Sequence, residues 1–358
     1  MKTGCLFDFR NPAQWVQPNA DLYNDTIDDM VSVEELGFDT AWTTEHHFLE
    51  DGYLPSQLAV LSAVAARTQR ISLGTFVLLL PLHDPVRVAE DAAVVDLISR
   101  GRLILGLGQG YRVGEFTGFE KDHKRRGQAL TEGIDILHKS WSGETFSHAG
   151  KFWRYTDITV TPSPAQPGGP PLMAGARSIK GIQRVARMGC HFLPIGNPED
   201  IDIYRTACTD LGREPGEVRI LRSCYVTDKD DTELDTVWPH VNYQVEHYAK
   251  WMHDANDKPE DRSNTSDGFR DLSNFFTGPP QKVLDQIKAF EAETGIDELV
   301  LAQFDEAGLG LLCGVVDEAL SQVDRLAHLA ILRAAAARMD GLGLFFPRIG
   351  HCTSPGIG

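Results

Sequence analysis

The sequence predicts an α/β protein of the (β/α)8 TIM-barrel class with insertions, and three observations support this class. Eight short apolar or β-branched runs recur along the chain, each followed by a segment with the apolar spacing of a helix. Such alternation is typical of a parallel sheet with right-handed crossovers. The 358 residues exceed the roughly 250 of a barrel core by enough for insertions. A doubly wound open sheet is the rival, but the first turn carries Asn11, Pro12 and Pro18 instead of a GxGxxG motif.

The expected strands are rich in Val, Ile, Leu and aromatic residues and end at glycine, proline or polar residues. They are residues 3–9, 39–44, 71–80, 101–108, 172–176, 190–195, 218–226 and 298–303. The expected helices show apolar residues mostly at three- to five-residue steps or have proline and glycine at their ends. They are residues 20–36, 57–66, 85–98, 125–141, 179–188, 198–211, 231–252, 281–293 and 311–337, and Pro239 is expected to kink or split the seventh.

The alternation of strands and helices predicts a single domain over residues 1–337. Two segments interrupt it: residues 146–171 read as a hairpin with a Pro-rich run, and residues 253–273 read as a polar, lid-like insert. Residues 338–358 are rich in glycine and proline and are expected to form a flexible C-terminal tail.

Composition and charge limit the possible partners and compartment. A net charge of −17 and a pI near 5.1 argue against nucleic acid and against anionic membrane surfaces. Six cysteines without a CxxC pair fit reduced, buried thiols. There is no apolar stretch of the roughly 20 residues that a membrane-spanning helix needs, and the start MKTGCLFDF does not resemble a signal peptide. We expect a cytoplasmic protein.

The stretch FDTAWTTEHHF, residues 38–48, ends an expected strand in three titratable side chains. Active sites of barrels lie at the carboxyl ends of the strands, so Glu45, His46 and His47 are candidates for chemistry. The alternative is a half-exposed histidine pair that merely caps the strand. Strand alternation places His46 and Thr44 on one face, toward the barrel mouth, with Glu45 and His47 on the other. His46 is the candidate general base or polar stabiliser, and Glu45 and His47 are expected to brace it.

Two further strand ends suggest a place for a planar, anionic ligand. The run GLGQGYR, residues 106–112, has glycines that let the backbone approach a ligand closely, although tight packing of loop on strand explains them equally well. The run MAGARS, residues 173–178, places Arg177 and Ser178 at the start of a helix, where free N–H groups favour a phosphate. A plain helix cap by Ser178 is the competing interpretation.

Other chemistries have weaker support. The possible metal ligands show no HxH or HExxH spacing and lack carboxylates at later strand ends, so no metal site is expected. No GxSxG motif indicates a nucleophilic serine. The aromatic stripe of the 146–171 insert is more typical of hairpin packing than of a ligand box. The possible metal ligands are Glu45, His46, His47, His83, Asp84 and His123, and the stripe is Phe146, Phe152, Trp153 and Tyr155.

These motifs together resemble the bacterial-luciferase-like flavin monooxygenases, which are single-domain (β/α)8 enzymes. The matching segments cover nearly the whole chain, from Lys2 to about Leu332, and are specific as a set. They are residues 37–48, 68–112, 171–189 and 294–304. The resemblance implies that reduced FMN, supplied by a separate NAD(P)H:flavin reductase, reacts with oxygen to form a peroxyflavin that oxygenates a small organic substrate.

The resemblance also assigns roles to individual residues. It implies that His46 is catalytic, that the flavin ring lies against Phe76 and Val77, and that the peptide between these two is cis. The phosphate contacts would fall on the loops after the fourth and fifth strands. The luciferases have Arg where this chain has Gln109, and Glu where it has Arg177, so the positive charge has moved between loops. The flavin-binding residues expected on this basis are Phe76, Val77, Gly108, Gln109, Tyr111, Arg177, Ser178 and Gly181.

Two alternatives remain open within the resemblance. A sister branch uses a deazaflavin coenzyme for hydride transfer, but its motif usually reads Asp-His-Phe where this chain has Glu-His-His-Phe. Non-catalytic flavin-binding members also exist, and retention of His46 argues against that alternative. Gly108 stands where the luciferases have a reactive Cys, so light emission is not implied. A homo-oligomer, most simply a dimer, is expected, and the sequence does not define the substrate.

Overall fold

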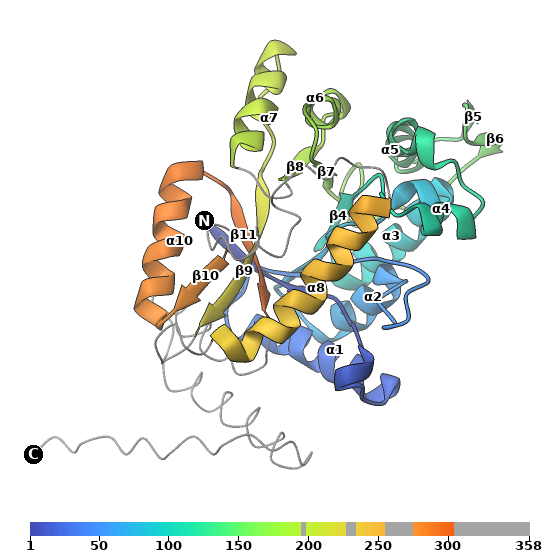
Figure 1. Cartoon of the computed structure of the whole chain (residues 1–358). Coiled ribbons are helices and arrows are strands. Elements are labelled where there is room, and N and C mark those ends of the chain that lie inside the picture. The colour runs from blue at the N-terminus through green and yellow to red at the C-terminus, as the bar shows by residue number, and fades with distance from the viewer. Residues whose placement is uncertain (195–197, 227–233, 255–274, 304–358) are drawn as a thin grey trace, which may run out of the picture. The chain divides into compact units, whose positions relative to one another are not determined.

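The computed structural model describes residues 1–194, 198–226, 234–254 and 275–303 (Figure 1). All of these belong to one compact unit, Met1–Ala319. The expected helix at 311–337, the tail at 338–358 and residues 255–273 of the lid-like insert lie outside the described residues. The single domain over residues 1–337 therefore stays a prediction.

Nine strands form one sheet in which every pair is parallel, in the order β10-β9-β11-β1-β2-β3-β4-β7-β8. A parallel bridge between Phe192 and Val218 brings β8 to the start of β9, so eight strands meet in a ring and β10 adds to β9. The predicted (β/α)8 class is confirmed. The strands are β1 (Lys2–Phe7), β2 (Thr40–Thr43), β3 (Ser72–Thr75), β4 (Leu103–Leu107), β7 (Leu172–Ala176), β8 (His191–Pro194), β9 (Arg219–Val226), β10 (Phe275–Gly278) and β11 (Glu298–Gln303).

The helices lie outside the strands in Figure 1, as expected for crossovers between parallel strands. They agree with the predicted ranges to within a few residues. Pro239 lies inside α8, which is continuous, so it does not split the helix. The long helices are α1 (Asn19–Glu35), α2 (Gln57–Arg67), α3 (Pro85–Ser99), α5 (Arg126–Ser140), α6 (Ile179–Met188), α7 (Glu199–Asp210), α8 (Leu234–Asp254) and α10 (Pro280–Thr294).

The third strand is shorter than predicted: β3 ends at Thr75, although the apolar run continues to Leu80. The Phe76–Val77 peptide is cis, as the family resemblance predicts. The hydroxyl of Thr75 and the amide of Leu78 both donate to the carbonyl oxygen of Gly106, at 2.8 Å each. Phe76 still donates its N–H to the carbonyl oxygen of Thr43 in β2, and Leu78 bridges to Leu107 of β4, so residues 76–79 form an irregular segment attached to both neighbouring strands.

Several short elements were not expected from the sequence, among them two 3-10 turns at Ala13–Trp15 and His123–Arg125 and three elements near the strand ends. The last three are α4 (Val113–Gly118), the 3-10 turn Leu80–Leu82 and strand β10. Each is too short for a periodic apolar pattern, and α4 contains two glycines, which weaken a helix signal. The predicted hairpin is confirmed as β5 (Phe146–Ala149) and β6 (Arg154–Ile158). Its aromatic stripe packs against Ala129 and Ile136 of α5, as expected for hairpin packing.

The barrel interior is centred on the fully buried side chain of Trp42. Trp42 packs with apolar residues from most of the strands, and its indole Nε1 donates to the buried carboxylate of Glu298 at 2.7 Å. Arg219 pairs with the same carboxylate, so the buried charge has a partner. The other members of this cluster are Phe76, Ile104, Met173, Leu193 and Val300.

Two expectations from composition can be compared with the described residues. Cys5, Cys190, Cys208 and Cys224 are buried, as predicted, and none of these four forms a disulfide bond. Among the helices of the described ranges, none is long and apolar enough to cross a membrane.

The indole of Trp42 leaves no room for a side chain at Gly74 on the neighbouring strand, because an added Cβ would overlap its six-membered ring. We expect Gly74→Ala to lower the free energy of unfolding by about 1–3 kcal/mol, the usual cost of overpacking a core. Urea unfolding followed by circular dichroism measures this difference. Gly114→Ala is the matched control, since a Cβ there meets nothing within 4 Å. A Gly74→Ala variant as stable as the wild type would contradict the packing described.

Candidate active site

The predicted site residues follow directly after β2. Glu45, His46 and His47 are 4–6% exposed although they lie beyond the last strand residue, Thr43. The alternative of a half-exposed histidine cap is therefore wrong. Strand alternation also predicts their directions correctly: His46 turns toward Tyr53 and Tyr111, whereas Glu45 and His47 bond to each other.

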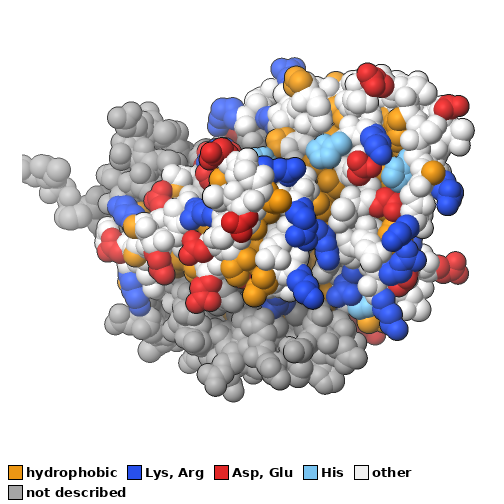
Figure 2. Space-filling model, turned by 90° about the horizontal axis from the view of Figure 1, so that it is seen from above, with side chains coloured by type: hydrophobic (Ala, Val, Ile, Leu, Met, Phe, Trp, Pro, Cys, Tyr) orange, Lys and Arg blue, Asp and Glu red, His pale blue; other side chains and the backbone are white. Residues whose placement is uncertain are grey.

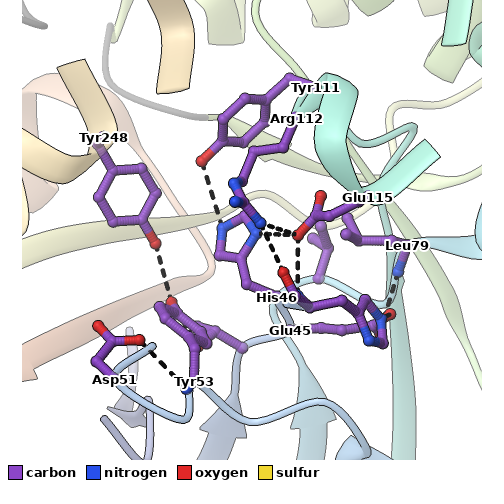
Figure 3. Close-up of polar contacts among 12 residues, drawn as sticks. Glu45, His46, Asp51, Tyr53, Leu79, Tyr111, Arg112, Glu115 and Tyr248 are labelled. Atoms are coloured by element: carbon purple, nitrogen blue, oxygen red, sulfur yellow. Dashed lines mark hydrogen bonds and ion pairs between the residues drawn. The ribbon is translucent and has the colours of Figure 1, made fainter. Parts of the chain in front are cut away.

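The Glu45 carboxylate has donors on both oxygens (Figure 3). Oε1 lies 2.8 Å from Nε2 of His47 and 2.7 Å from Nε2 of His83. Oε2 accepts from the side-chain amide of Gln57 at 3.1 Å and from the backbone N–H of Leu79 at 3.2 Å. The same Gln57 amide donates to the carbonyl oxygen of Val77, next to the cis peptide. Glu45 thus joins the end of β2 to the loop after β3.

Glu45 and His83 stabilise each other's charged forms. Burial alone would raise the pKa of Glu45, but the charge of His83 and the hydrogen bonds from both histidines lower it to about 2. Burial would lower the pKa of His83, yet the Glu45 carboxylate raises it above 6.5. The ring nitrogens and Oε1 lie within 4.8 Å of one another, a grouping that can hold a metal ion. An ion there would replace two hydrogen bonds, and the absence of a metal stays a prediction.

His46 has partners at both ring nitrogens. Nδ1 lies 2.8 Å from Oε1 of Glu115, and Nε2 lies 3.3 Å from the hydroxyl of Tyr111. The Glu115 oxygen also accepts from the backbone N–H of His47 at 3.0 Å and from Arg112 at 3.1 Å. A carboxylate on Nδ1 favours the proton on that nitrogen, which leaves Nε2 as the nitrogen that faces the barrel mouth.

Glu115 is a residue of the candidate site that the sequence did not indicate. It lies on α4 and is fully buried, and its Oε2 has no hydrogen-bond partner. Burial alone would raise the pKa of Glu115, but the hydrogen bond and charge of His46 lower it. A glutamate in a short Gly-containing segment, seven residues after the glycine-rich strand end, carries little signal by itself. Its role became visible only through the contact with His46.

Aromatic side chains surround the His46 ring. Its centroid lies 4.8 Å from that of Tyr53 and 5.0 Å from that of Trp251, and Tyr248 lies 5.9 Å away. The hydroxyls of Tyr53 and Tyr248 are hydrogen-bonded at 2.9 Å, as Figure 3 shows. Burial raises the pKa of Tyr53 and of Tyr111 well above 10, so both phenols stay protonated. Tyr248 and Trp251 come from α8, whose contribution the sequence did not predict.

The loop after β4 lies against α6, the helix that follows β7. Oε1 of Gln109 accepts from Nη1 of Arg184 on α6 at 3.2 Å. Ser178 accepts from the N–H of Gly181 and so caps α6, which is the competing interpretation of that motif. Arg177 lies near enough to Tyr111 to lower the pKa of its phenol. Arg184 was not among the predicted residues because it lies within a helix, two turns from the motif.

Basic side chains gather near the loops after β4 and β7. The pKa of Arg184 is lowered by burial and by the charges of Arg187 and Arg126, which places three guanidinium groups close together. Although the chain is acidic overall, Figure 2 shows lysine and arginine side chains alongside a band of apolar ones on the face drawn. Arg177 directly precedes the N-cap Ser178, and its positive charge beside the start of α6 suits a phosphate.

The position expected to bind the flavin ring also fits a flat group that lies against the backbone. Gly108 is buried, and a Cβ there would overlap the side chain of Val77, so the loop after β4 lies directly against the cis-peptide segment. The predicted positions Phe76, Val77 and Gly108 are thus brought together. A Cβ at Gly108 or Gly110 would meet Val77 or Phe116, so packing of the loop accounts for these glycines. The features that fit a flavin are the cis-peptide segment and the arginine side chains near the loops after β4 and β7. The binding roles of these residues stay predictions.

The fold and the site define a parallel (β/α)8 barrel with a histidine–carboxylate pair at the carboxyl ends of its strands. Residues 1–298 match the model of the luciferase-like monooxygenase family, and the chain belongs to this family. The family recognised from sequence motifs is therefore confirmed.

Individual relatives include enzymes with two kinds of cofactor. The chain is 27% identical over 303 residues to the oxygenase component of a flavin-dependent trigonelline monooxygenase from Acinetobacter baylyi, covering 79% of this chain and 83% of the relative. It is 34% identical over 151 residues to an F420-dependent glucose-6-phosphate dehydrogenase from Amycolatopsis mediterranei, covering 40% of this chain and 45% of the relative. A crystal structure of a monooxygenase from Streptomyces bottropensis matches with a TM-score of 0.73 at 24% identity, covering 90% of this chain and all of that chain.

The opposite pKa shifts of Glu45 and His83 predict a pH-dependent contribution to stability. The folded pKa of His83 lies above its unfolded value, so its contribution is complete below about pH 6.5 and is lost as the pH rises through the folded pKa. The pKa of Glu45 is depressed to about 2, so its contribution is complete above about pH 4.5 and is lost as the pH falls toward 2. The pair stabilises the fold most between these limits.

We therefore expect His83→Gln to cost roughly 1 kcal/mol of unfolding free energy near pH 6 and less near pH 9. Glutamine can still donate to Glu45 but cannot take up a proton. Urea unfolding at both pH values measures the difference. His138→Gln, which changes an exposed histidine of α5, controls for the loss of a histidine as such. An equal cost at the two pH values would show that His83 is not held in its charged form.

Proposed function

We propose that this chain is the oxygenase component of a two-component flavin-dependent monooxygenase. It would use reduced FMN, made by a separate NAD(P)H:flavin reductase, and dioxygen to oxygenate a small organic substrate. The observation that carries the proposal is His46, buried at the strand ends with Nδ1 on Glu115 and Nε2 toward the barrel mouth. The match to the trigonelline monooxygenase oxygenase component over most of both chains supports it.

The residues that would hold the cofactor are the predicted set, extended by Arg184. Phe76, Val77 and Gly108 would contact the ring. Gln109, Arg177, Ser178 and Gly181 would contact the ribityl phosphate with Arg184, and Tyr111 would contact the cofactor beside His46. Reduced flavin supplies the electrons that activate dioxygen when it is bound.

The chain's own residues then have separable tasks. His46 holds or accepts a proton at Nε2 while Glu115 fixes the ring by accepting the N–H at Nδ1. Tyr111 donates toward Nε2 and thereby marks the point at which a polar group of the substrate would sit. Tyr53, Tyr248 and Trp251 surround this point with aromatic surface and exclude water from it.

The alternative is hydride transfer with a deazaflavin coenzyme and without oxygen. It is favoured by relatives such as the F420-dependent glucose-6-phosphate dehydrogenases, which match a shorter part of this chain at slightly higher identity. The motif Glu45-His46-His47 argues for the FMN branch. A non-catalytic flavin-binding role is the third possibility, and the His46–Glu115 pair argues against it. A dimeric state and a cytoplasmic location stay predictions.

Cofactor titration tests the proposal most directly. We expect reduced FMN to bind the purified protein at least about tenfold more tightly than the reduced deazaflavin coenzyme, measured by calorimetry under anaerobic conditions. With NADH and a flavin reductase present, substrate-dependent oxygen uptake should follow. Tight binding of the deazaflavin with none of FMN would replace the proposal by the alternative.

His46→Ala should retain FMN and lose turnover. The side chain lies toward Tyr53 and Trp251 rather than among the phosphate-loop residues, so the flavin dissociation constant should change little. Loss of a positioned proton-transfer group should lower kcat by roughly 10²–10⁴-fold. Oxygen uptake coupled to product formation measures the effect. His240→Ala, on α8 and beside Trp15, is a control for histidine loss elsewhere. Turnover that survives in His46→Ala would remove His46 from the mechanism.

Glu115→Gln should lower kcat on the order of 10²-fold while flavin binding stays unchanged. The amide keeps the volume of the carboxylate but no longer favours the Nδ1 proton, so His46 loses its fixed orientation. Steady-state kinetics and flavin titration separate the two effects. Glu120→Gln, an exposed residue just after α4, is the matched control. If both variants turned over like the wild type, Glu115 would have only a structural role.

A further inference from the structure

Arg10, three residues after β1, is a buried cation with unused hydrogen-bonding capacity. Its side chain is 5% exposed. Nε donates to Oδ2 of Asp51 at 2.7 Å, and Nη2 lies 2.7 Å from the same oxygen as an ion pair. Among the described residues, Nη1 is buried without a hydrogen-bond partner, and the ion-pair contact with Asp51 is the one interaction of Nη2. Buried N–H groups of a guanidinium are costly to leave unbonded, so this edge of the side chain indicates a missing acceptor.

The unused edge lies beside the candidate active site. The guanidinium carbon of Arg10 lies 5.2 Å from the ring centroid of Tyr53 and 5.8 Å from that of Trp251. These two rings are also in contact with the imidazole of His46, at 4.8 and 5.0 Å. Tyr53 and Trp251 therefore contact both Arg10 and His46.

The charges around Arg10 leave room for an added anion. Burial alone would lower the pKa of Arg10, but the carboxylates of Asp8 and Asp51 raise it, so the guanidinium remains charged. Burial is also the largest influence on Asp8, and it raises the pKa of that carboxyl against the charge of Arg10. Asp51 binds only the Nε and Nη2 edge of the guanidinium, so Nη1 is left for a further acceptor.

On the basis of the proposed function, we propose that Arg10 binds an anionic oxygen of the substrate and that the substrate is a small organic acid with a flat body. The carboxylate would accept from Nη1 of Arg10, and the body would lie against Tyr53 and Trp251 toward His46. A guanidinium fork is the side chain best matched to a carboxylate. Its aromatic surroundings strengthen this pairing by excluding water.

Two probe molecules of nearly equal shape test this assignment and do not require the substrate to be identified. Benzoate carries a carboxylate and benzamide does not, and isothermal titration calorimetry on the full-length protein measures the binding of both. We expect benzoate to bind at least about tenfold more tightly, since a site with unpaired buried donors favours the ligand that pairs them. Equal binding, or no benzoate binding at millimolar concentration, would overturn the proposal.

Variants assign the preference to Arg10. In Arg10→Gln the preference for benzoate should fall to about twofold or less, and Arg10→Lys should retain part of it because the charge remains. Arg87→Gln changes an exposed arginine of α3 and should leave the preference intact. A preference that survives in Arg10→Gln would contradict the assignment, and if that variant does not fold, the Arg10→Lys result and the wild-type preference decide. FMN titration of the same samples separates this outcome from a failure of the proposed function.

Discussion

The buried carboxylate of Glu45 is the constraint on which the arrangement of the site depends. An ionised carboxylate with almost no exposure is tolerated only when each oxygen is hydrogen-bonded. Its donors come from Gln57 on α2, from the histidines 47 and 83, and from the backbone of Leu79. Satisfying this one charge therefore sets the spacing between the end of β2 and the loop after β3, where the cis peptide lies.

A second carboxylate completes the arrangement from the other side. Glu115 bonds both the ring of His46 and the backbone N–H of His47, so it holds the chain between the two histidines as well as the imidazole itself. Because successive side chains point in opposite directions, the ring of His46 bonds to Glu115 and the ring of His47 bonds to Glu45. The motif Glu-His-His thus has three distinct tasks: one buried charge, one candidate proton carrier and one brace between strand ends.

Features set by local pattern could be predicted from the sequence. Buried parallel strands read as continuous apolar runs, and these runs located β7 and β11 to the residue. The bounds of helix α6 were also predicted to the residue. The opposite directions of the His46 and His47 side chains followed from strand alternation alone. Glu115, Arg184 and the aromatic residues of α8 could not be predicted, because their roles depend on which elements meet in space. The end of β3 at Thr75 was also missed, since an apolar run does not reveal where a ladder is interrupted by a hydroxyl.

The residues that orient His46 and the residues on the opposite side of the site come from different parts of the chain. The groups that orient His46 lie between Glu45 and Glu115 and are joined by hydrogen bonds with charged partners. The opposite side of the site comes from Arg10 after β1 and from Tyr248 and Trp251 of α8. Tyr248 and Trp251 contact His46 through edge-on or tilted ring contacts and not through hydrogen bonds. Ring contacts tolerate exchange of one flat or apolar group for another better than a bonded carboxylate does. Substrate choice can therefore change on Arg10 and α8 while the orientation of His46 stays as it is.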